Sequence, residues 1–134
     1  MPSKRLVRSQ TKLAIKRIYE PPSAEDGARI MVDRIWPRGV SKSEAHIDVW
    51  LKELAPSGEL RKWFGHEETR WAEFCSRYSR ELDQKAEIVQ LIQEKLAAQN
   101  VTLLYAAANQ QHNNARCLAD YLVASKRPDG ETLG

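Results

Sequence analysis

The chain has 134 residues, of which 42% are hydrophobic and 29% are charged, and its formal net charge is +3. This composition is typical of one folded domain and excludes an intrinsically disordered chain. No stretch approaches the roughly 18 consecutive apolar residues of a membrane span, and no apolar segment of a secretory signal follows the first methionine. We therefore expect a cytoplasmic protein without a membrane partner.

The positive charge belongs to the N-terminal end rather than to the body of the chain. Residues 1–20 carry six basic side chains and one acidic side chain, a net charge of +5, whereas residues 21–134 carry 15 basic and 17 acidic side chains, a net charge of −2. An extended basic surface for nucleic acid is therefore not expected on the body. The pattern predicts a basic flexible arm over residues 1–11, a single domain over 12–125 and a frayed tail over 126–134.

The two cysteines, Cys75 and Cys117, are predicted to be free thiols. Two cysteines without a CxxC spacing form neither a disulfide framework nor a zinc motif, and they suit a reducing compartment. Cys75 falls on the apolar face of a predicted helix, so we expect an inert core thiol there. Cys117 has no base at helical spacing, so it is not expected to act as a nucleophile.

Four segments have the alternation or the short apolar runs of β-strands. They cover residues 12–19, 29–35, 47–54 and 101–107. The first and third segments alternate apolar and polar residues, whereas the second and fourth are apolar runs that suit buried strands. The third segment also permits a helical interpretation.

Helices are predicted between these strands and after the last one. They cover residues 42–46, 57–65, 67–82, 84–99 and 115–123. Ser41 and Glu44 fit a capping box before the first helix, and Ser57 fits the N-cap of the second. The three longer helices have apolar residues at helical spacing. Strands that alternate with helices predict an α/β fold, one small layered domain with a short, partly parallel sheet flanked by helices.

Polar and aromatic side chains gather after three of the predicted strands, where an open α/β sheet binds its ligands. An aromatic-lined pocket with several basic side chains suits an anionic ligand. Asp33 and His112 are the candidate catalytic residues, because they are titratable groups at strand ends. The candidate ligand-binding residues are Arg34, Trp36, Arg38, Lys52, Arg61, Trp63, His66, Tyr105 and Asn113.

Purely structural roles are open for the same residues. Asp33 and Arg34 can form an ion pair under the turn, and the four tryptophans can belong to the core. Asn113 or Asn114 is a natural helix N-cap, and His66 can satisfy the last carbonyls of a helix. A metal site from His66, His112 and Asp33 fits no known ligand spacing, so no metal is expected.

Five phrases of the chain resemble the YeaO-like family of small bacterial proteins. The phrases are VDRIWPRGVSK (32–42), WLKELAPS (50–57), LRKWFGH (60–66), VTLLYAA (101–107) and HNNA (112–115). The resemblance implies an α/β domain in a bacterial cytoplasmic protein and no particular activity. A more distant branch carries a cysteine-histidine-arginine turn where this chain has His112-Asn113-Asn114, so the thiol chemistry suspected there is not expected here.

The favoured function is binding of a small anionic ligand, phosphorylated or nucleotide-like, with acid–base chemistry at Asp33 or His112. A second hypothesis is nucleic-acid binding, in which the arm contacts phosphates and Trp36 or Trp63 stacks on bases. A third is an interaction module without a ligand. No cofactor is expected, and the sequence indicates neither an oligomeric state nor whether the protein is an enzyme.

Overall fold

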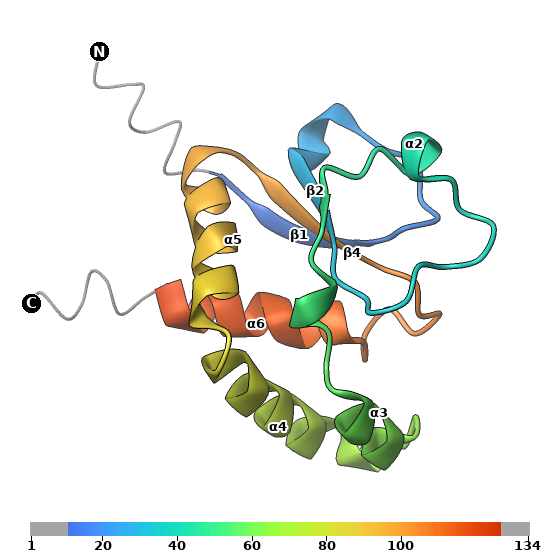
Figure 1. Ribbon diagram of the computed structural model, residues 1–134, viewed down its shortest axis with the longest axis vertical. Coiled ribbons are helices and arrows are strands. Elements are labelled where there is room, and N and C mark those ends of the chain that lie inside the picture. Colours follow the sequence, from blue (N-terminus) through green and yellow to red (C-terminus); the bar gives the residue numbers. More distant parts are fainter. Residues whose placement is uncertain (1–10, 127–134) are drawn as a thin grey trace, which may run out of the picture.

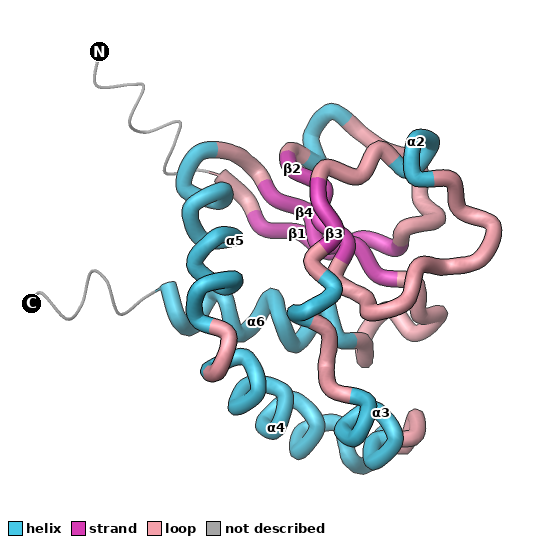
Figure 2. Tube along the Cα trace, in the orientation of Figure 1, coloured by secondary structure: helices cyan, strands magenta, loops and turns pink. Residues whose placement is uncertain are grey.

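The computed structural model describes residues 11–126, which contain a four-stranded sheet (Figures 1 and 2). The strands are β1 (Leu13–Arg17), β2 (Ala28–Met31), β3 (Val49–Trp50) and β4 (Val101–Tyr105), and their order across the sheet is β1-β4-β2-β3. All of the pairings are parallel. The predicted α/β class is confirmed. Of the arm predicted over residues 1–11 and the tail predicted over 126–134, residues 1–10 and 127–134 lie outside the described residues.

Helices and short 3-10 segments connect the strands. They are the 3-10 turn Ala24–Asp26, α2 (Lys42–Ala45), the 3-10 turn Lys52–Leu54, α3 (Gly58–Phe64), the 3-10 turn Glu68–Arg70, α4 (Trp71–Asp83), α5 (Ala86–Ala98) and α6 (Asn114–Lys126). The predicted serine caps are confirmed, because Ser41 Oγ accepts from the Glu44 N–H and Ser57 Oγ accepts from the Leu60 N–H, but the return bond from the Ser41 N–H to the Glu44 side chain that a capping box requires does not form. In the described part of the chain, no helix is both long enough and apolar enough to cross a membrane.

The first face of the sheet carries the larger core. Ile30 and Leu103 pair across β2 and β4 and are fully buried on this face. Helices α5 and α6 pack against β4, and α4 packs on α6 as an outer element next to α3 (Figure 1). This arrangement follows from the apolar stripe of each helix, which has to be buried against another element.

The second face is covered by the segment between β2 and β3. Met31 and Leu104, the neighbours in sequence of the first-face residues, are buried here with Ala45 of α2. Trp36 and Trp50 pack against this smaller cluster, and their ring centroids lie 5.3 Å apart. Alternate residues of the strands therefore serve the two faces, as the period of two in a β-strand requires.

Charged side chains form a closed cluster at the start of β2. Asp26 accepts from Lys16 Nζ at 3.1 Å and from the Arg29 guanidinium, and Arg29 also donates to the backbone carbonyls of Ala45 and His46. Although burial raises the pKa of Asp26, the bonds from Lys16, Ser23 and Arg29 outweigh it, so the net shift is downward. Each charge in this cluster has a partner.

All four strands are shorter than predicted, and for β2 and β3 the contacts that end the strand are visible. The segment over 29–35 leaves the sheet after Met31, and Trp50 Nε1 donates to the Asp33 carbonyl at 2.7 Å, which holds the departing chain. The segment over 47–54 has only two strand residues, because a 3-10 turn over Lys52–Leu54 buries Leu54 in the first-face core. Alternation alone could not reveal this turn.

Candidate ligand-binding site

A cavity of about 540 Å³ lies at the carboxyl ends of β2 and β4. After β2 the chain turns to the second face, where Trp36 and Ala45 pack, and after β4 it turns to the first face, where Ala115 and Leu118 pack. Neighbouring parallel strands whose connections leave to opposite faces create the crevice in which open α/β sheets bind ligands. The volume is in the range of small-molecule sites.

The lining comes from five segments, which are far apart in the sequence. They are the chain after β2, the turn before α3, α3 with the residues that follow it, the first turn of α4, and the loop that leads into α6. The lining residues are Asp33, Arg34, Ile35, Ala55, Pro56, Arg61, Phe64, His66, Glu68, Trp71, Phe74, Ala107, Ala108, Asn109, His112, Asn113 and Asn114.

Asp33 and Asn114 tie the two strand ends together at the base of the cavity. Asp33 Oδ2 accepts from the Ala106 N–H at 3.0 Å, and Asn114 Nδ2 donates to the Val32 carbonyl at 3.2 Å. Burial raises the pKa of the Asp33 carboxyl, and the Ala106 N–H, the Asn114 amide and the charge of Arg61 only partly oppose this rise. Asp33 is therefore a carboxyl group that is easier to protonate than an exposed aspartate. It forms no ion pair with Arg34.

Aromatic rings form one wall of the cavity. Trp71 stacks on Phe74 with centroids 5.5 Å apart, Phe64 lies 4.7 Å from Phe74, and the His112 ring lies 4.7 Å from Trp71. The Nδ1 atom of His112 is buried without a hydrogen-bond partner, and Glu68 Oε2 is 3.8 Å away. This wall offers a flat apolar surface beside a free polar nitrogen.

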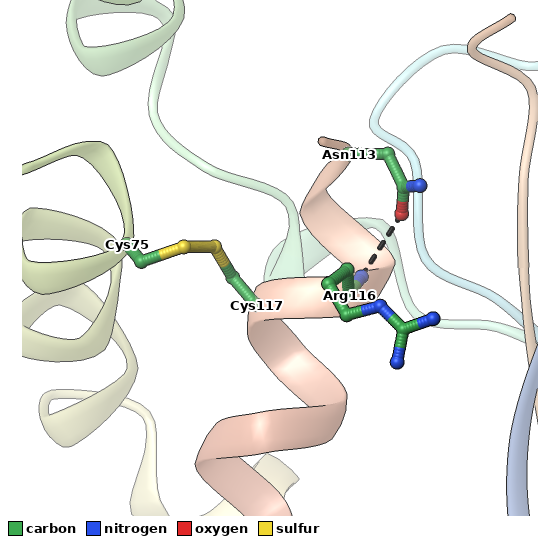
Figure 3. The surroundings of a disulfide bond; sticks show 4 residues. All are labelled: Cys75, Asn113, Arg116 and Cys117. Atoms are coloured by element: carbon green, nitrogen blue, oxygen red, sulfur yellow. Dashed lines mark hydrogen bonds between the residues drawn. A yellow bond between two sulfur atoms is a disulfide. The ribbon is translucent and has the colours of Figure 1, made fainter. Parts of the chain in front are cut away.

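The loop before α6 is braced by its own side chains. Asn109 Oδ1 accepts from the N–H groups of Gln111 and His112, both at 2.9 Å, and Asn113 Nδ2 donates to the Asn109 carbonyl at 3.0 Å. Asn113 Oδ1 caps α6 by accepting from the Arg116 N–H (Figure 3). The N-cap interpretation of Asn113 is confirmed, and its presence in the cavity lining does not conflict with that role.

Basic side chains stand at the rim. Arg34 is anchored by a bond from Nη2 to the Pro56 carbonyl at 3.2 Å, while Arg61 is exposed on α3. His66 follows Gly65, and both have positive φ angles, 62° and 51°, so the chain reverses there and brings the imidazole to the cavity. The non-glycine left-handed conformation of His66 is unusual, although histidine adopts it more often than most residues.

Six of the predicted site residues meet in this cavity and five do not. The six are Asp33, Arg34, Arg61, His66, His112 and Asn113. Trp36 donates from Nε1 to the Val40 carbonyl and packs on Trp50, whose ring lies 5.2 Å from Lys52 Nζ. Trp63 lies between the guanidinium groups of Arg70 and Arg77, at 5.2 Å and 4.2 Å. Tyr105 is buried at the end of β4, and Arg38 is exposed in the loop after β2.

The sequence did not single out the aromatic wall. Phe64, Trp71 and Phe74 follow the helical spacing of core residues, and only the packing of α3 against α4 turns part of this stripe toward the cavity. Among residues 11–126, no three histidine, cysteine, aspartate or glutamate side chains are grouped as metal ligands would be.

The prediction of two free thiols is wrong. Cys75 of α4 and Cys117 of α6 form a disulfide, with their Cα atoms 5.5 Å apart (Figure 3). This Cα separation lies within the usual range for a disulfide. The pairing was not visible in the sequence because 42 positions separate the two cysteines, and only the packing of α4 on α6 brings them together.

A protein-family model described as the inactive DUF488-N3 subclade matches residues 12–132. The chain belongs to this subclade. Among curated relatives, the uncharacterized protein YeaO of Escherichia coli is 44% identical over 107 residues, which cover 80% of this chain and 93% of the relative. The uncharacterized proteins Mb3100c of Mycobacterium bovis and Rv3073c of Mycobacterium tuberculosis are each 39% identical over 114 residues, 84% of this chain and 95% of theirs. The resemblance to the YeaO-like family is thus confirmed. No solved structure matches this DUF488-N3 chain.

Proposed function

We propose that the protein binds a small anionic ligand, phosphorylated or nucleotide-like, in the cavity at the ends of β2 and β4. The observation that carries the proposal is the convergence of Arg34, Arg61, His66 and His112 on one cavity of about 540 Å³. Acidic side chains there are fewer, namely Asp33 and Glu68, and the pKa of Asp33 is raised by burial.

The cavity suits a ligand with an anionic end and a flat end. Arg34 and Arg61 supply guanidinium donors that match carboxylate or phosphate oxygens. The half-buried rings of Phe64 and Trp71 supply apolar surface against which a planar ring can lie. The unpaired Nδ1 of His112 offers one further polar contact.

Binding of a ligand has more support than catalysis of a reaction. The subclade is described as inactive. Both cysteines are held in a disulfide, so neither is a free nucleophile in this state. We therefore propose that Asp33 and His112 bind and orient the ligand, and we do not assign them the acid–base step that the sequence allowed.

Nucleic-acid binding has weaker support. Lys42 Nζ lies 5.4 Å from the Trp36 ring centroid, and the guanidinium groups of Arg70 and Arg77 lie 5.2 Å and 4.2 Å from that of Trp63, so basic side chains compete with bases for these indoles. Deleting residues 1–11 tests this alternative directly. Under the ligand proposal the deletion leaves small-anion binding unchanged, whereas loss of affinity for a single-stranded oligonucleotide would revive the alternative.

We also propose that the protein works in the cytoplasm. Disulfides are rare in that compartment, and those that occur there are usually transient or redox-sensing. Alkylation of free thiols in intact cells, followed by cell fractionation, tests the location. We expect the protein in the soluble cytoplasmic fraction with a reducible Cys75–Cys117 bond, and recovery from an oxidising compartment would contradict it.

The binding proposal is tested by a thermal-shift screen with inorganic phosphate, adenosine monophosphate, glucose 6-phosphate and benzoate. A ligand at about 100 times its Kd stabilises the folded state by about 2.7 kcal/mol, which raises the Tm of a chain of this size by on the order of 10 °C. We expect such a rise for at least one of these anions and its loss in Arg61→Ala. Arg38→Ala is the matched control, because Arg38 is an exposed arginine outside the cavity lining.

Two results would contradict the proposal. One is the absence of any shift across a broad anion library, which would favour the interaction module without a ligand. The other is an equal loss of the shift in Arg38→Ala and Arg61→Ala, which would place the anion outside the cavity.

A further inference from the structure

The disulfide joins α4, which carries the aromatic wall, to α6, which follows the loop wall over residues 107–114, and the two walls meet where Trp71 contacts His112. Cys75 lies one turn after Trp71 on α4, and Cys117 lies one turn after Asn113 at the start of α6. The Cys117 N–H donates to the Asn113 carbonyl at 3.4 Å, so the cysteine and the lining residue share a helical turn. The bond therefore fixes the spacing between the aromatic wall and the loop wall.

Few other contacts hold the first turn of α4 against that loop. One is the ring contact between Trp71 and His112, with centroids 4.7 Å apart. Another is a bond of 3.3 Å from Asn109 to Glu68, and both of these side chains are exposed. Exposed polar contacts contribute little to stability. In the described residues the disulfide is the covalent constraint between the helix that carries Trp71 and the helix that follows His112.

The remainder of α4 is held independently of the disulfide. Tyr78 and Leu82 are fully buried in the first-face core together with Leu118 and Leu122 of α6. Tyr78 also donates a hydrogen bond to the Leu54 carbonyl. Phe74 of the first turn is buried in the same core, so breaking the disulfide would leave α4 packed and loosen only the half-buried Trp71 side of that turn.

The two sulfur atoms differ in access. Cys117 is 4% exposed, whereas Cys75 is only half-buried, so an external thiolate reaches the Cys75 Sγ atom first. A dithiol reductant is the co-reactant. Its thiolate attacks Cys75 Sγ, the bond between the cysteines breaks, and Cys117 leaves as a thiolate that takes up a proton. The second thiol of the reductant then displaces Cys75, and two electrons and two protons have moved to the protein while the reductant has become a disulfide.

We propose that the Cys75–Cys117 disulfide is a reversible switch that sets the shape of the cavity, tight when oxidised and loosened when reduced. The effect on ligand affinity rests on the proposed function, whereas the change of shape does not. A coupling of this kind typically changes affinity by about 5- to 150-fold. By linkage, a bound ligand makes the disulfide harder to reduce by the same factor.

The shape change is tested without any ligand, by NMR of the histidine ring protons in the full chain before and after reduction by dithiothreitol. The ring current of Trp71 acts on His112, so we expect the His112 signals to move on reduction. His46, at the C-cap of α2, is the internal control and should not move. Unchanged His112 signals after thiol titration has confirmed reduction would overturn the proposal. So would general unfolding on reduction, because the bond would then be a structural staple.

A titration with inorganic phosphate, followed by the same signals, tests the coupling. Phosphate that binds the oxidised chain at least fivefold more tightly than the reduced chain, or than Cys75→Ser/Cys117→Ser, supports the switch. Equal affinity for both forms would overturn the switch and leave the proposed function standing. If phosphate binds neither form, the result counts against the proposed function. The NMR comparison of the histidine signals without ligand then tests the switch by itself.

Discussion

Two aspartate–arginine pairs flank the same strand, and they are built in opposite ways. At the start of β2, Asp26 and Arg29 are buried and bonded to each other. At the end of β2, Asp33 accepts a backbone bond while Arg34 turns away to the Pro56 carbonyl and stays exposed. The first pair closes a polar cluster, and the second borders the cavity.

The directions of the two pKa shifts express this difference. The Asp26 carboxyl titrates below the ordinary value, because its partners outweigh the cost of burial, and the Asp33 carboxyl titrates above it, because burial dominates. A polar group that is buried with all its partners stabilises one conformation, whereas one that lacks a full set of partners can bind a ligand. The start of β2 therefore serves the fold, and its end is available for function.

The largest effect is expected from removing the closed pair. Arg29→Ala leaves Asp26 and two backbone carbonyls without their buried donor, which should cost about 3–5 kcal/mol of the free energy of unfolding. Arg34→Ala, at the open end, should cost no more than about 0.5 kcal/mol. Denaturant unfolding of both variants measures the contrast. If Arg29→Ala and Arg34→Ala lost the same free energy of unfolding, the start and the end of β2 would not differ as described.

The Cys75–Cys117 disulfide should contribute less to the free energy of unfolding than the upper limit expected for the Asp26–Arg29 pair. Closing a loop between positions 42 apart removes conformational entropy from the unfolded chain worth about 4 kcal/mol, and measured values are often smaller. Reduction, or Cys75→Ser/Cys117→Ser, should lower the midpoint of denaturant unfolding while the far-UV circular dichroism stays native. A complete loss of helical signal in buffer would contradict the independent packing of α4.

Replacing Asp33 should have a smaller effect on the free energy of unfolding, and it should stabilise the fold rather than destabilise it. The folded pKa of Asp33 is raised, so its ionisation destabilises the fold once the pH exceeds the ordinary aspartate pKa of about 3.9. Asp33→Asn keeps an acceptor for the Ala106 N–H and should be at least as stable as the wild type at pH 7, with the difference vanishing below that pKa.

Asp26→Asn is the matched variant with the reverse sign. The lowered pKa of Asp26 means that its carboxylate stabilises the fold above the unfolded-state pKa, and this stability is lost as the pH falls through the folded pKa. The variant should be clearly less stable than the wild type at pH 7. Unfolding curves at pH 7 and pH 3 that gave both variants the same sign would refute the comparison.

The smallest effect on stability is expected at the rim. Arg61 is exposed and its side chain makes no hydrogen bond to the described residues, so Arg61→Ala should change the free energy of unfolding by less than about 0.5 kcal/mol. Its effect should appear only in the thermal shift caused by an anion. A loss of stability as large as that of Trp71→Ala would mean that Arg61 supports the fold.

The fold could be predicted from the sequence because its elements have strong local signals. The apolar run over 101–107 contains the central strand β4, and the apolar stripe over 67–82 contains α4. The prediction failed where distant packing decides. The pairing of Cys75 with Cys117 and the turn over Lys52–Leu54 both depend on contacts that no local pattern contains.

The site could be predicted only in outline. Asp33 and His112 were found because both follow buried strands, and parallel strands end at one edge. Trp36 and Lys52 were expected in the same pocket by that argument, but the chain leaves β2 and β3 in directions that place these side chains together on the second face. The same rule could not select Trp71 and Phe74, which reach the cavity from a helix.

The most direct test is an NMR titration of backbone amides with adenosine monophosphate, which joins an anionic end to a flat ring. The account predicts concentration-dependent shifts at Asp33 and through residues 107–114, and none at Asp26 or Arg29 at the start of the same strand. Shifts centred on Trp36 and Trp50, or spread evenly over both ends of β2, would contradict it.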